Sequence, residues 1–374
     1  MLPALLLALS CALDFGVLSL LVRRGERPLG LTRLTLALLV AVVVALVKMP
    51  LFAYAAGSFF FGVTLGWVTL IVVTPLVAWR VLLRGDATHA TRAVAVVGAL
   101  GLPLLGIYGS VLEPRNLQIE RVEVPITPAH APAEPLRIAV LADIQSRSVD
   151  EHLRTAVREA MRFEPHLIVL PGDLIQLESE EEYLAAVPQF RELLQPLDAP
   201  LGVYFVIGNT DTDELVARAF EGTRVRLLVD ESIELEFAGR RIVLGGADIF
   251  QLSPSSPECF VSRFDRRDAD ELRILVSHLP DHGLTWLSGN KQGIDLAIAG
   301  HTHGGQVTIP GFGPPVTLSL VPRAVAAGGL HRVHGRQIYV SRGIGMERGL
   351  APPLRLFCPP EVSLLTLVPA RDER

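Results

Sequence analysis

Side chains that could hold metal ions stand at the ends of five short apolar runs between residues 136 and 303. The runs read LRIAVLAD, HLIVLPGD, VYFVIGN, LRILVSH and DLAIAG, and each has the composition of a buried β-strand. In an open α/β sheet, ligand sites form beyond the carboxyl ends of the strands, so these ends would bring their polar residues to one edge. The residues in question are Asp143, Asp173, Asn209, His278, His301 and His303.

Carboxylate, amide and imidazole groups are the oxygen and nitrogen ligands that suit Mn, Fe or Zn. The set contains no cysteine, which argues against a structural zinc site. Each residue alone has an ordinary explanation. An Asp after a strand is often a turn residue, Asn209 before Thr210 and Asp211 could form an Asx turn, and a single His at a strand end is more often structural. The hypothesis of a metal site therefore depends on the whole set.

The elements that must position these residues form one α/β domain over residues 135–374. Strand-like runs alternate with helical ones, and VDEHLRTAVREAMRF has apolar positions at helical spacing with Asp150 as its N-cap. Further strand-like runs are RRIVLGGAD, QIYVSRG and EVSLLTLVP. The Pro- and Ala-rich segment VEVPITPAHAPAEP precedes the domain, so residues 114–134 are expected to be a linker.

Residues 1–113 are predicted to cross a membrane four times. Hydrophobic residues make up 50% of the chain, and the excess is concentrated in stretches 2–22, 31–54, 58–83 and 93–112. Each stretch is near the about 20 residues that a helix needs to cross a bilayer. The first is interpreted as an anchor rather than a signal peptide, because its positive charges follow the apolar run and three more spans come after it. Asp14 is expected to face the interior of the bundle.

Basic residues in the short loops predict the orientation of these spans. The first loop carries four arginines and the third carries Arg80, Arg84 and Arg92, whereas the second, around residues 48–57, carries only Lys48. Loops one and three are therefore expected in the cytoplasm. Four spans then place both termini, and with them the C-terminal domain, outside the cytoplasm. The predicted localisation is a multi-pass protein of the cell membrane.

The charge balance and the cysteines bear on two further classes. A formal net charge of −5 gives no basic face for nucleic acid. Three cysteines cannot form a disulfide framework. Cys11 lies in an apolar stretch, and Cys259 and Cys358 are interpreted as separate thiols unless the fold brings them together.

Five short motifs, LADIQ, PGDLI, GNTD, VSHLPD and AGHTHGGQV, together with the tail YVSRGIG…PLRLFCPPEVSLLTL, resemble the calcineurin-like metallophosphoesterases of the membrane-anchored bacterial branch. The resemblance covers about residues 135–369. It implies an α/β fold, a four-layer αββα sandwich, with two divalent metal ions (Mn, Fe or Zn, of which Mn is preferred). The four predicted transmembrane helices would precede this sandwich as an all-α region.

The resemblance also implies roles by position. Asp173 would bridge the two ions, Asp143 and His303 would hold one ion, and Asn209, His278 and His301 would hold the other. Adjacent glycines, Gly304 and Gly305, would let the backbone turn tightly beside the two histidines. The catalytic set implied is Asp143, Asp173, Asn209, His278, Thr210 and Asp211.

Two positions depart from the family pattern. Gln145 stands where the family usually has His; its carbonyl oxygen would be a weaker ligand that favours Mn or Mg over Zn. Thr210 stands where the family usually has a His that contacts the phosphate and is a candidate general acid. Threonine cannot donate a proton near neutral pH as histidine can, and losing a general acid typically costs about 10²–10⁴-fold in rate. Other histidines that could substitute are His282, His331 and His334.

The leading prediction is a membrane-anchored, metal-dependent phosphoesterase. It would hydrolyse a phosphodiester, diphosphate or phosphomonoester, preferably in a lipid or cell-envelope precursor, by a hydroxide that bridges the ions. Arg147 and Arg342 could add phosphate contacts. One alternative is a catalytically degenerate relative that acts as a binding or sensory module, which the two departures favour and the retained ligands disfavour. Another is a transporter or receptor built from the four spans, which their low polarity disfavours.

Overall fold

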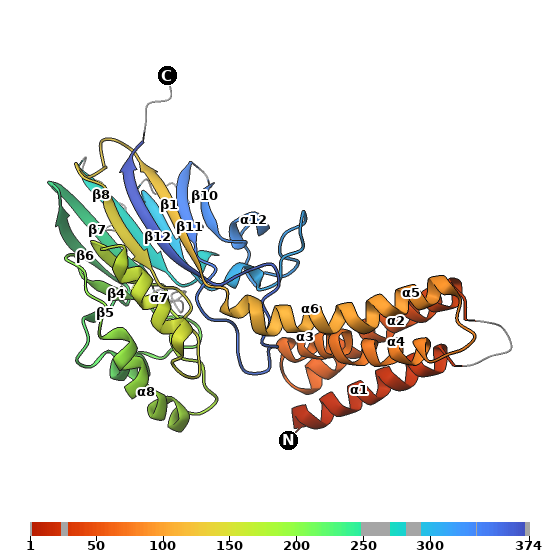
Figure 1. Ribbon diagram of the computed structural model, residues 1–374. Helices are drawn as coiled ribbons and strands as arrows, with labels where there is room; N and C mark the ends of the chain where they lie inside the picture. Colours follow the sequence, from red (N-terminus) through yellow and green to blue (C-terminus); the bar gives the residue numbers. More distant parts are fainter. Residues whose placement is uncertain (1, 24–28, 248–269, 282–292, 334, 371–374) are drawn as a thin grey trace. The chain divides into compact units, whose positions relative to one another are not determined.

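The computed structural model describes residues 2–23, 29–247, 270–281, 293–333 and 335–370 (Figure 1). The chain divides into two compact units, each with its own internal packing. A helical unit consists of Met1–Leu112 together with the short segment Glu347–Pro353, and a C-terminal unit consists of Glu113–Met346 and Leu354–Arg374. The segment Glu347–Pro353 therefore groups with helices that lie far before it in the sequence.

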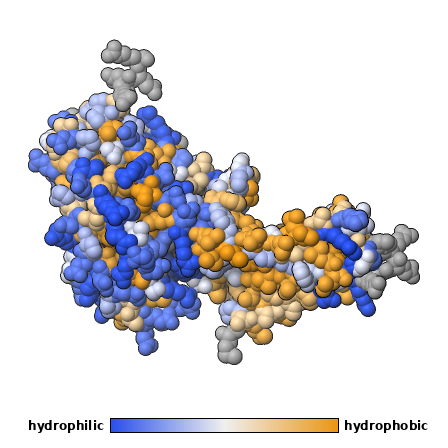
Figure 2. All heavy atoms as spheres, viewed as in Figure 1, coloured by the Kyte–Doolittle hydropathy of each residue, from blue (hydrophilic) through white to orange (hydrophobic). Residues whose placement is uncertain are grey.

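Among the described residues, four helices are long and apolar enough to cross a membrane, which confirms the four apolar stretches as helices. Their surface is dominated by hydrophobic side chains (Figure 2). Two spans contain short π-helical turns directly ahead of a proline-containing helix, where Pro75 or Pro103 cannot donate to a regular helical ladder. The spans are α1 (Leu2–Leu21), α2 (Leu31–Ala55), the run α3 (Phe59–Val68), η1 (Thr69–Val73) and α4 (Thr74–Leu82), and the run α5 (His89–Val96), η2 (Val97–Gly101), α6 (Leu102–Ile107), η3 (Tyr108–Leu112) and η4 (Glu113–Arg115).

Asp14 in α1 faces the interior of the helical unit, where it is only 5% exposed. It forms an ion pair with Lys48 of α2, and Oγ1 of Thr69 donates a hydrogen bond to its Oδ2 at 2.5 Å. Lys48, which the sequence analysis counted with the second loop, thus lies inside α2. The pair neutralises two charges that hydrocarbon could not solvate.

Two six-stranded mixed sheets form the framework of the C-terminal unit. In the first sheet all neighbours are parallel except β12 and β2, and in the second all are parallel except the outer pairs at each edge. The first sheet has the order β1 (Gln118–Ile126), β12 (Glu361–Pro369), β2 (Leu136–Val140), β3 (Leu167–Leu170), β4 (Val203–Phe205) and β5 (Val225–Leu227). The second has the order β10 (Gly329–Val333), β11 (Arg336–Val340), β9 (Leu296–Ala299), β8 (Glu271–Ser277), β7 (Arg240–Ala247) and β6 (Glu231–Phe237).

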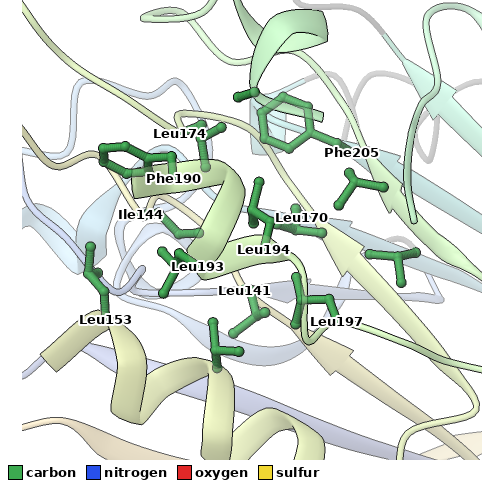
Figure 3. Packing of buried hydrophobic residues seen from close by; sticks show 14 of the residues in the cluster. Leu141, Ile144, Leu153, Leu170, Leu174, Phe190, Leu193, Leu194, Leu197 and Phe205 are labelled. Atoms are coloured by element: carbon green, nitrogen blue, oxygen red, sulfur yellow. The ribbon is translucent and has the colours of Figure 1, made fainter. Parts of the chain in front are cut away.

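The two sheets pack face to face, and helices cover the outer faces. Strand β2 shows why: Ile138 and Val140 belong to the core between the sheets, whereas Ala139 belongs to the core under the helices, as the two-residue period of a strand requires. Figure 3 shows part of the outer core of the first sheet, to which Phe190 and Phe205 both belong. The covering helices are α7 (Glu151–Arg162), α8 (Glu180–Leu194) and α9 (Asp213–Phe220) on the first sheet and α12 (Arg323–Ala326) on the second. This arrangement is the predicted αββα sandwich.

Two local features refine the sequence analysis. Asp150 caps α7 as expected, because its side chain accepts a hydrogen bond from the backbone N–H of Leu153 at 3.1 Å. Residues 114–134, expected to be a linker, contain β1, which pairs along its whole length with β12. The segment therefore extends the first sheet.

Candidate metal centre

The six polar residues singled out from the sequence come together at one edge of the sandwich. Both sheets contribute, because the carboxyl ends of their central parallel strands meet there. Asp143 follows β2, Asp173 follows β3, Asn209 follows β4, His278 follows β8, and His301 and His303 follow β9.

Several of these residues have a left-handed backbone, which non-glycine residues seldom adopt. The φ angles are 48° for Asp143, 56° for Asp173, 72° for His301 and 48° for His303, and Gln145 has a φ of 31°. Backbone strain of this kind costs about 1–3 kcal/mol per residue and is concentrated at functional sites. The turns after the strands are thus shaped to aim side chains rather than to minimise local energy.

Asn209, His278 and His301 form the tightest group in the centre. Nδ1 of His278 lies 2.7 Å from the carbonyl oxygen of Pro171, which can only accept, so this nitrogen donates the hydrogen bond. Its other nitrogen, Nε2, lies 2.9 Å from Oδ1 of Asn209 and carries a lone pair when the ring is neutral. Nδ1 of His301 lies 2.9 Å from the same oxygen and 3.2 Å from Nε2 of His278.

This convergence of electron-rich atoms fits a cation. Nε2 of His278 and Oδ1 of Asn209 are both atoms with lone pairs that a cation placed between them could share. Ligands about 2.0–2.1 Å from a tetrahedral ion are separated by about 3.4 Å, close to the spacing found here. The three residues have the chemistry and the spacing of one metal site.

Asp173 lies between this group and a second one. Its Oδ2 is 3.5 Å from Nε2 of His278, and its Oδ1 accepts a hydrogen bond from the backbone N–H of Thr210 at 2.9 Å. Asp143, Asp173 and His278 together offer three ligand atoms within 4.8 Å of one another. Gly208 leaves room for the carboxylate of Asp173, because a Cβ at position 208 would lie 2.2 Å from its Oδ1.

The second set of ligands that the resemblance implies, Asp143, Gln145 and His303, consists of buried residues. Oδ1 of Asp143 accepts from the backbone N–H of His301 at 2.9 Å, whereas its buried Oδ2 has no hydrogen-bond partner among the described residues. The amide nitrogen of Gln145 donates to Oε1 of Gln176 at 3.2 Å, so the oxygen is the atom of this amide with ligand chemistry. Carboxylate, amide and imidazole here again fit a divalent ion.

The electrostatics of the centre also favour a cation. Burial raises the pKa of Asp143 well above its usual range, and the nearby carboxylate of Asp173 raises it further. Burial, with Asp173 again as the second cause, raises the pKa of Asp211 to about 7. Three buried carboxyl groups repel one another near neutral pH, and bound divalent ions would reverse that balance.

Known proteins match this chain over the region that builds the centre. The model of the calcineurin-like phosphoesterase family matches residues 136–305. The uncharacterized metallophosphoesterase YkuE of Bacillus subtilis is 30% identical over 224 residues, which cover 58% of this chain and 73% of YkuE. The chain belongs to the calcineurin-like phosphoesterase family.

Two further relatives carry an activity in their names. Phosphodiesterase YaeI of Escherichia coli is 29% identical over 244 residues, covering 63% of this chain and 83% of YaeI. UDP-2,3-diacylglucosamine pyrophosphatase LpxG of Chlamydia muridarum is 23% identical over 337 residues, covering 73% of this chain and 96% of LpxG. This calcineurin-like phosphoesterase is therefore a phosphoric ester hydrolase of a metal-dependent family.

Asp211, which the sequence analysis placed in the catalytic set, holds two loops of the phosphoesterase together. Its Oδ2 accepts from the backbone N–H groups of Asp173 and Gly208 at 2.7 and 2.9 Å, and its Oδ1 accepts from that of Leu174 at 2.9 Å. With both oxygens used in this way, Asp211 has the geometry of a positioning residue. It fixes the turn that carries Asp173.

Arg355 is a residue of the centre that the sequence analysis did not identify. Its guanidinium is fully buried and donates to the carbonyl oxygens of Gly345, Arg342 and Cys358 at 2.5, 2.8 and 3.1 Å. Its Nη2 also lies 3.4 Å from Nδ1 of His303. The arginine ties the loop after β11 to the second group of ligands. The only signal in the sequence was its place in the tail motif PLRLFCPPE.

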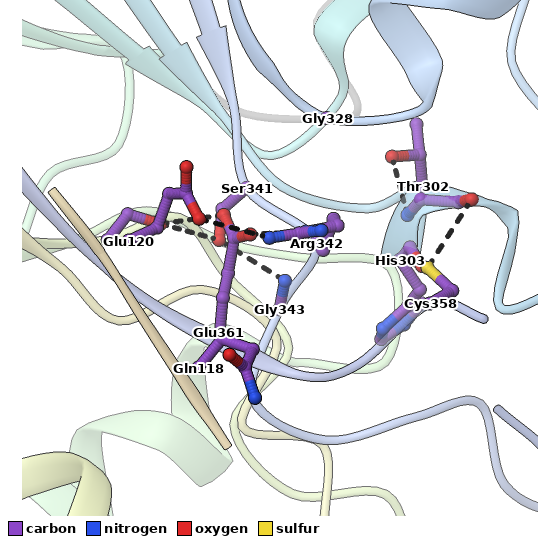
Figure 4. Close-up of polar contacts among 12 residues, drawn as sticks. Gln118, Glu120, Thr302, His303, Gly328, Ser341, Arg342, Gly343, Cys358 and Glu361 are labelled. Carbon is purple, nitrogen blue, oxygen red and sulfur yellow. Dashed lines mark hydrogen bonds and ion pairs between the residues drawn. The ribbon is translucent and has the colours of Figure 1, made fainter. Parts of the chain in front are cut away.

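The two arginines suggested as phosphate contacts have other partners. Arg342 pairs with Glu361, and its Nη2 lies 3.4 Å from Oε2 of Glu120 (Figure 4). Arg147 lies on the surface and pairs with Glu178 at 3.1 Å. The contacts of both arginines are those of structural ion pairs and do not favour a role in binding phosphate.

The remaining candidates divide between the described residues and the rest. His331 lies in β10, away from the candidate ligands, and its Nε2 is 3.0 Å from the carbonyl oxygen of Gly328. Cys358 is a buried free thiol that donates to the carbonyl oxygen of His303 at 3.3 Å. His282, His334 and Cys259 lie outside the described residues.

Proposed function

We propose that this chain is a membrane-anchored, metal-dependent hydrolase of phosphodiesters and diphosphates whose substrate is lipid-linked. The observation that carries the catalytic part is the convergence of Asn209, His278 and His301, whose Oδ1, Nε2 and Nδ1 atoms lie 2.9–3.2 Å apart, beside the buried carboxylates of Asp143 and Asp173. The four apolar helices support the anchor. The activities named for YaeI and LpxG support the substrate class.

The residues divide into two ligand sets. Asn209, His278 and His301 would hold one ion, Asp143, Gln145 and His303 the other, and Asp173 would serve both. Two divalent ions, with Mn as the preferred metal, would supply Lewis acidity to water and phosphoryl oxygens. Asp211 and Arg355 hold the loops that aim these ligands. The ligand carboxylates and imidazoles are thereby preorganised before substrate arrives.

Thr210 bears on which esters react well. Its backbone N–H donates to Asp173, which places its backbone beside the centre. A hydroxyl cannot protonate a leaving group near neutral pH. A substrate whose leaving group is already stable as an anion does not need that proton. A phosphate leaving from a diphosphate meets this condition, and an alkoxide leaving from a dialkyl phosphodiester does not.

Turnover of model esters by the detergent-solubilised full chain tests the proposed activity. We expect hydrolysis of bis(p-nitrophenyl) phosphate with added Mn²⁺ and its loss with excess EDTA, because nitrophenolate leaves without an acid. A diphosphate should react faster than a dialkyl phosphodiester for the same reason. Absence of turnover with each of Mn²⁺, Fe²⁺ and Zn²⁺ would contradict the proposal.

We further propose that the C-terminal unit faces away from the cytoplasm. The arginine-rich first and third loops support this orientation. The second loop, between α2 and α3, carries no basic residue once Lys48 is placed inside α2. By the same bounds Arg33, Arg80 and Arg92 lie inside helices, and the remaining arginines between the spans are still confined to the first and third loops.

Thiol labelling in intact cells tests this orientation. A cysteine at the exposed Glu236 of β6 should react with a membrane-impermeant maleimide, and one at the exposed Gly85 should react only after lysis. The unmodified chain gives the background from its own cysteines. Labelling of Gly85→Cys but not Glu236→Cys in intact cells would reverse the orientation.

A further inference from the structure

The C-terminal unit exposes large apolar side chains in one place only, within the part of the chain that the structure describes. We call this place the apolar loop; it consists of residues 308–321 together with Phe357. Leu320 is 97% exposed, and Phe312 is 55% exposed. Isolated exposed apolar residues need no explanation. A cluster that contains all the exposed large apolar residues described in a unit does need one. Its exposed members are Ile309, Phe312, Val316, Leu318, Leu320 and Phe357.

Backbone hydrogen bonds, rather than apolar packing, shape this loop. The N–H of Thr308 donates to the carbonyl oxygen of Leu356 at 2.8 Å, which joins the two segments of the apolar loop. A tight turn forms where Ile309 and Gly313 exchange hydrogen bonds at 3.1 and 2.9 Å. Near its end, Asp281 accepts from the N–H of Leu320 at 2.6 Å. The apolar side chains are thus displayed by an ordered backbone.

The loop is built onto the metal centre. It begins five residues after His303, and a Cβ at Gly305 would lie 2.5 Å from Cβ of Pro314 in the loop. On the other side, Leu356 directly follows Arg355, whose guanidinium lies beside His303. Whatever the apolar loop contacts is therefore held at a fixed distance from the candidate ligands.

The chain path indicates lipid as the occupant. The last apolar helix ends at Arg115, and β1 begins at Gln118. Pro353 ends the short segment that belongs to the helical unit, where Leu350 packs with Phe61 and Leu65. Phe357 follows Pro353 by four residues, so it lies at most about 14 Å from it. If the helices cross a bilayer, the apolar loop starts close to its surface.

The form of the loop also suits a lipid surface. Its tip is a turn that projects single apolar side chains, and the guanidinium of Arg323 stacks on the ring of Phe312 at 4.1 Å. Aromatic rings and arginines together are typical of the membrane interface, where the ring enters the acyl region and the cation meets lipid phosphate.

We propose that the apolar loop is a membrane-docking loop that inserts into the lipid surface and holds the metal edge against it. The inference deepens the proposed function and depends on its membrane anchor, because docking would bring the phosphate of a lipid-linked substrate to the ligands without extracting the lipid. The acyl chains would stay in the bilayer.

Depth-dependent quenching in vesicles tests the docking without any substrate. The full chain, reconstituted in phosphatidylcholine–phosphatidylglycerol vesicles, would carry an NBD fluorophore at Leu320→Cys, with NBD at Glu236→Cys as the matched control. Brominated lipids in both leaflets should quench position 320 several-fold more than position 236. Equal quenching at both positions would overturn the proposal. Quenching at position 320 that appears only after a lipid diphosphate is added would also overturn it. Energy transfer between labels on two copies, without quenching by lipid, would overturn it as well.

A second measurement separates docking from chemistry. The double variant Phe312→Ser/Leu320→Ser should hydrolyse water-soluble bis(p-nitrophenyl) phosphate at the wild-type rate and a vesicle-embedded lipid diphosphate about tenfold more slowly. An unchanged rate on the vesicle substrate would count against docking. If position 320 is quenched but no form of the protein cleaves the lipid, the docking loop stands and the proposed substrate class fails.

Discussion

Replacing Asp173 by Asn is expected to abolish hydrolysis and to empty both ion sites together. The side chain lies between the two ligand groups, 3.5 Å from Nε2 of His278, and the variant keeps its size while removing its charge. Loss of the ions removes several kcal/mol of transition-state stabilisation, and each 1.4 kcal/mol is a factor of ten, so a fall of at least about 10³-fold is expected. Elemental analysis and turnover of bis(p-nitrophenyl) phosphate measure the two effects on one sample.

The matched control is the same change at Asp150. That residue is an exposed N-cap of α7, and Asn caps a helix as well as Asp does, so Asp150→Asn should keep its metal and its activity. Full metal content in Asp173→Asn would contradict the shared role of this carboxylate. Loss of one ion only would assign Asp173 to a single group of ligands.

Replacing Thr210 by His is expected to raise the rate on esters with poor leaving groups. The backbone N–H of Thr210 bonds to Asp173, so the new imidazole would start beside the centre, and its pKa near 6.5 suits proton donation at neutral pH. A positioned general acid typically contributes about 10²–10⁴-fold. The gain should appear on a dialkyl phosphodiester and be small on bis(p-nitrophenyl) phosphate, because nitrophenolate leaves without help.

Thr210→Gln separates acid catalysis from a new phosphate contact, because glutamine can donate a hydrogen bond but not a proton. The His variant alone should gain a fall in rate as pH rises through its pKa. Equal gains in both variants would indicate a phosphate contact. An unchanged rate in the His variant would show that position 210 does not reach the leaving group.

The sequence was sufficient to predict an α/β domain and the edge that carries the candidate ligands, whereas the four-layer sandwich was expected from the family resemblance. The reason is local: each strand is a short apolar run, and a parallel strand delivers whatever follows it to the carboxyl edge. Asp143 and His278 lie 135 residues apart in the chain, yet placing each of them at a strand end needed only its own strand. The N-cap at Asp150 was predicted for the same reason, since a cap depends on neighbours within one turn.

What the sequence did not reveal depends on long-range contacts. Asp211 accepts hydrogen bonds from three backbone amides on two loops, and Arg355 donates to carbonyl groups across a turn. Neither role produces a residue spacing that could be recognised in the sequence. Lys48 was counted with the second loop, although the expected span 31–54 also includes it. Its partner Asp14, 34 residues earlier, lets it lie inside α2 instead. Strand β1 was interpreted as linker because its pairing partner, β12, is near the end of the chain.

The short segment Glu347–Pro353 sets a limit on how the protein can be taken apart. Leu350 packs against the cluster of Phe52, Phe61 and Leu65, and its carbonyl oxygen accepts from Oγ1 of Thr64 at 2.7 Å. Deleting the first 112 residues to obtain a water-soluble enzyme would leave this leucine without its apolar neighbours and its carbonyl without its donor. The anchor and the hydrolase are therefore not exchangeable modules. Joining the hydrolase to a different anchor would require redesigning this segment, which lies in the sequence between two parts of the C-terminal unit.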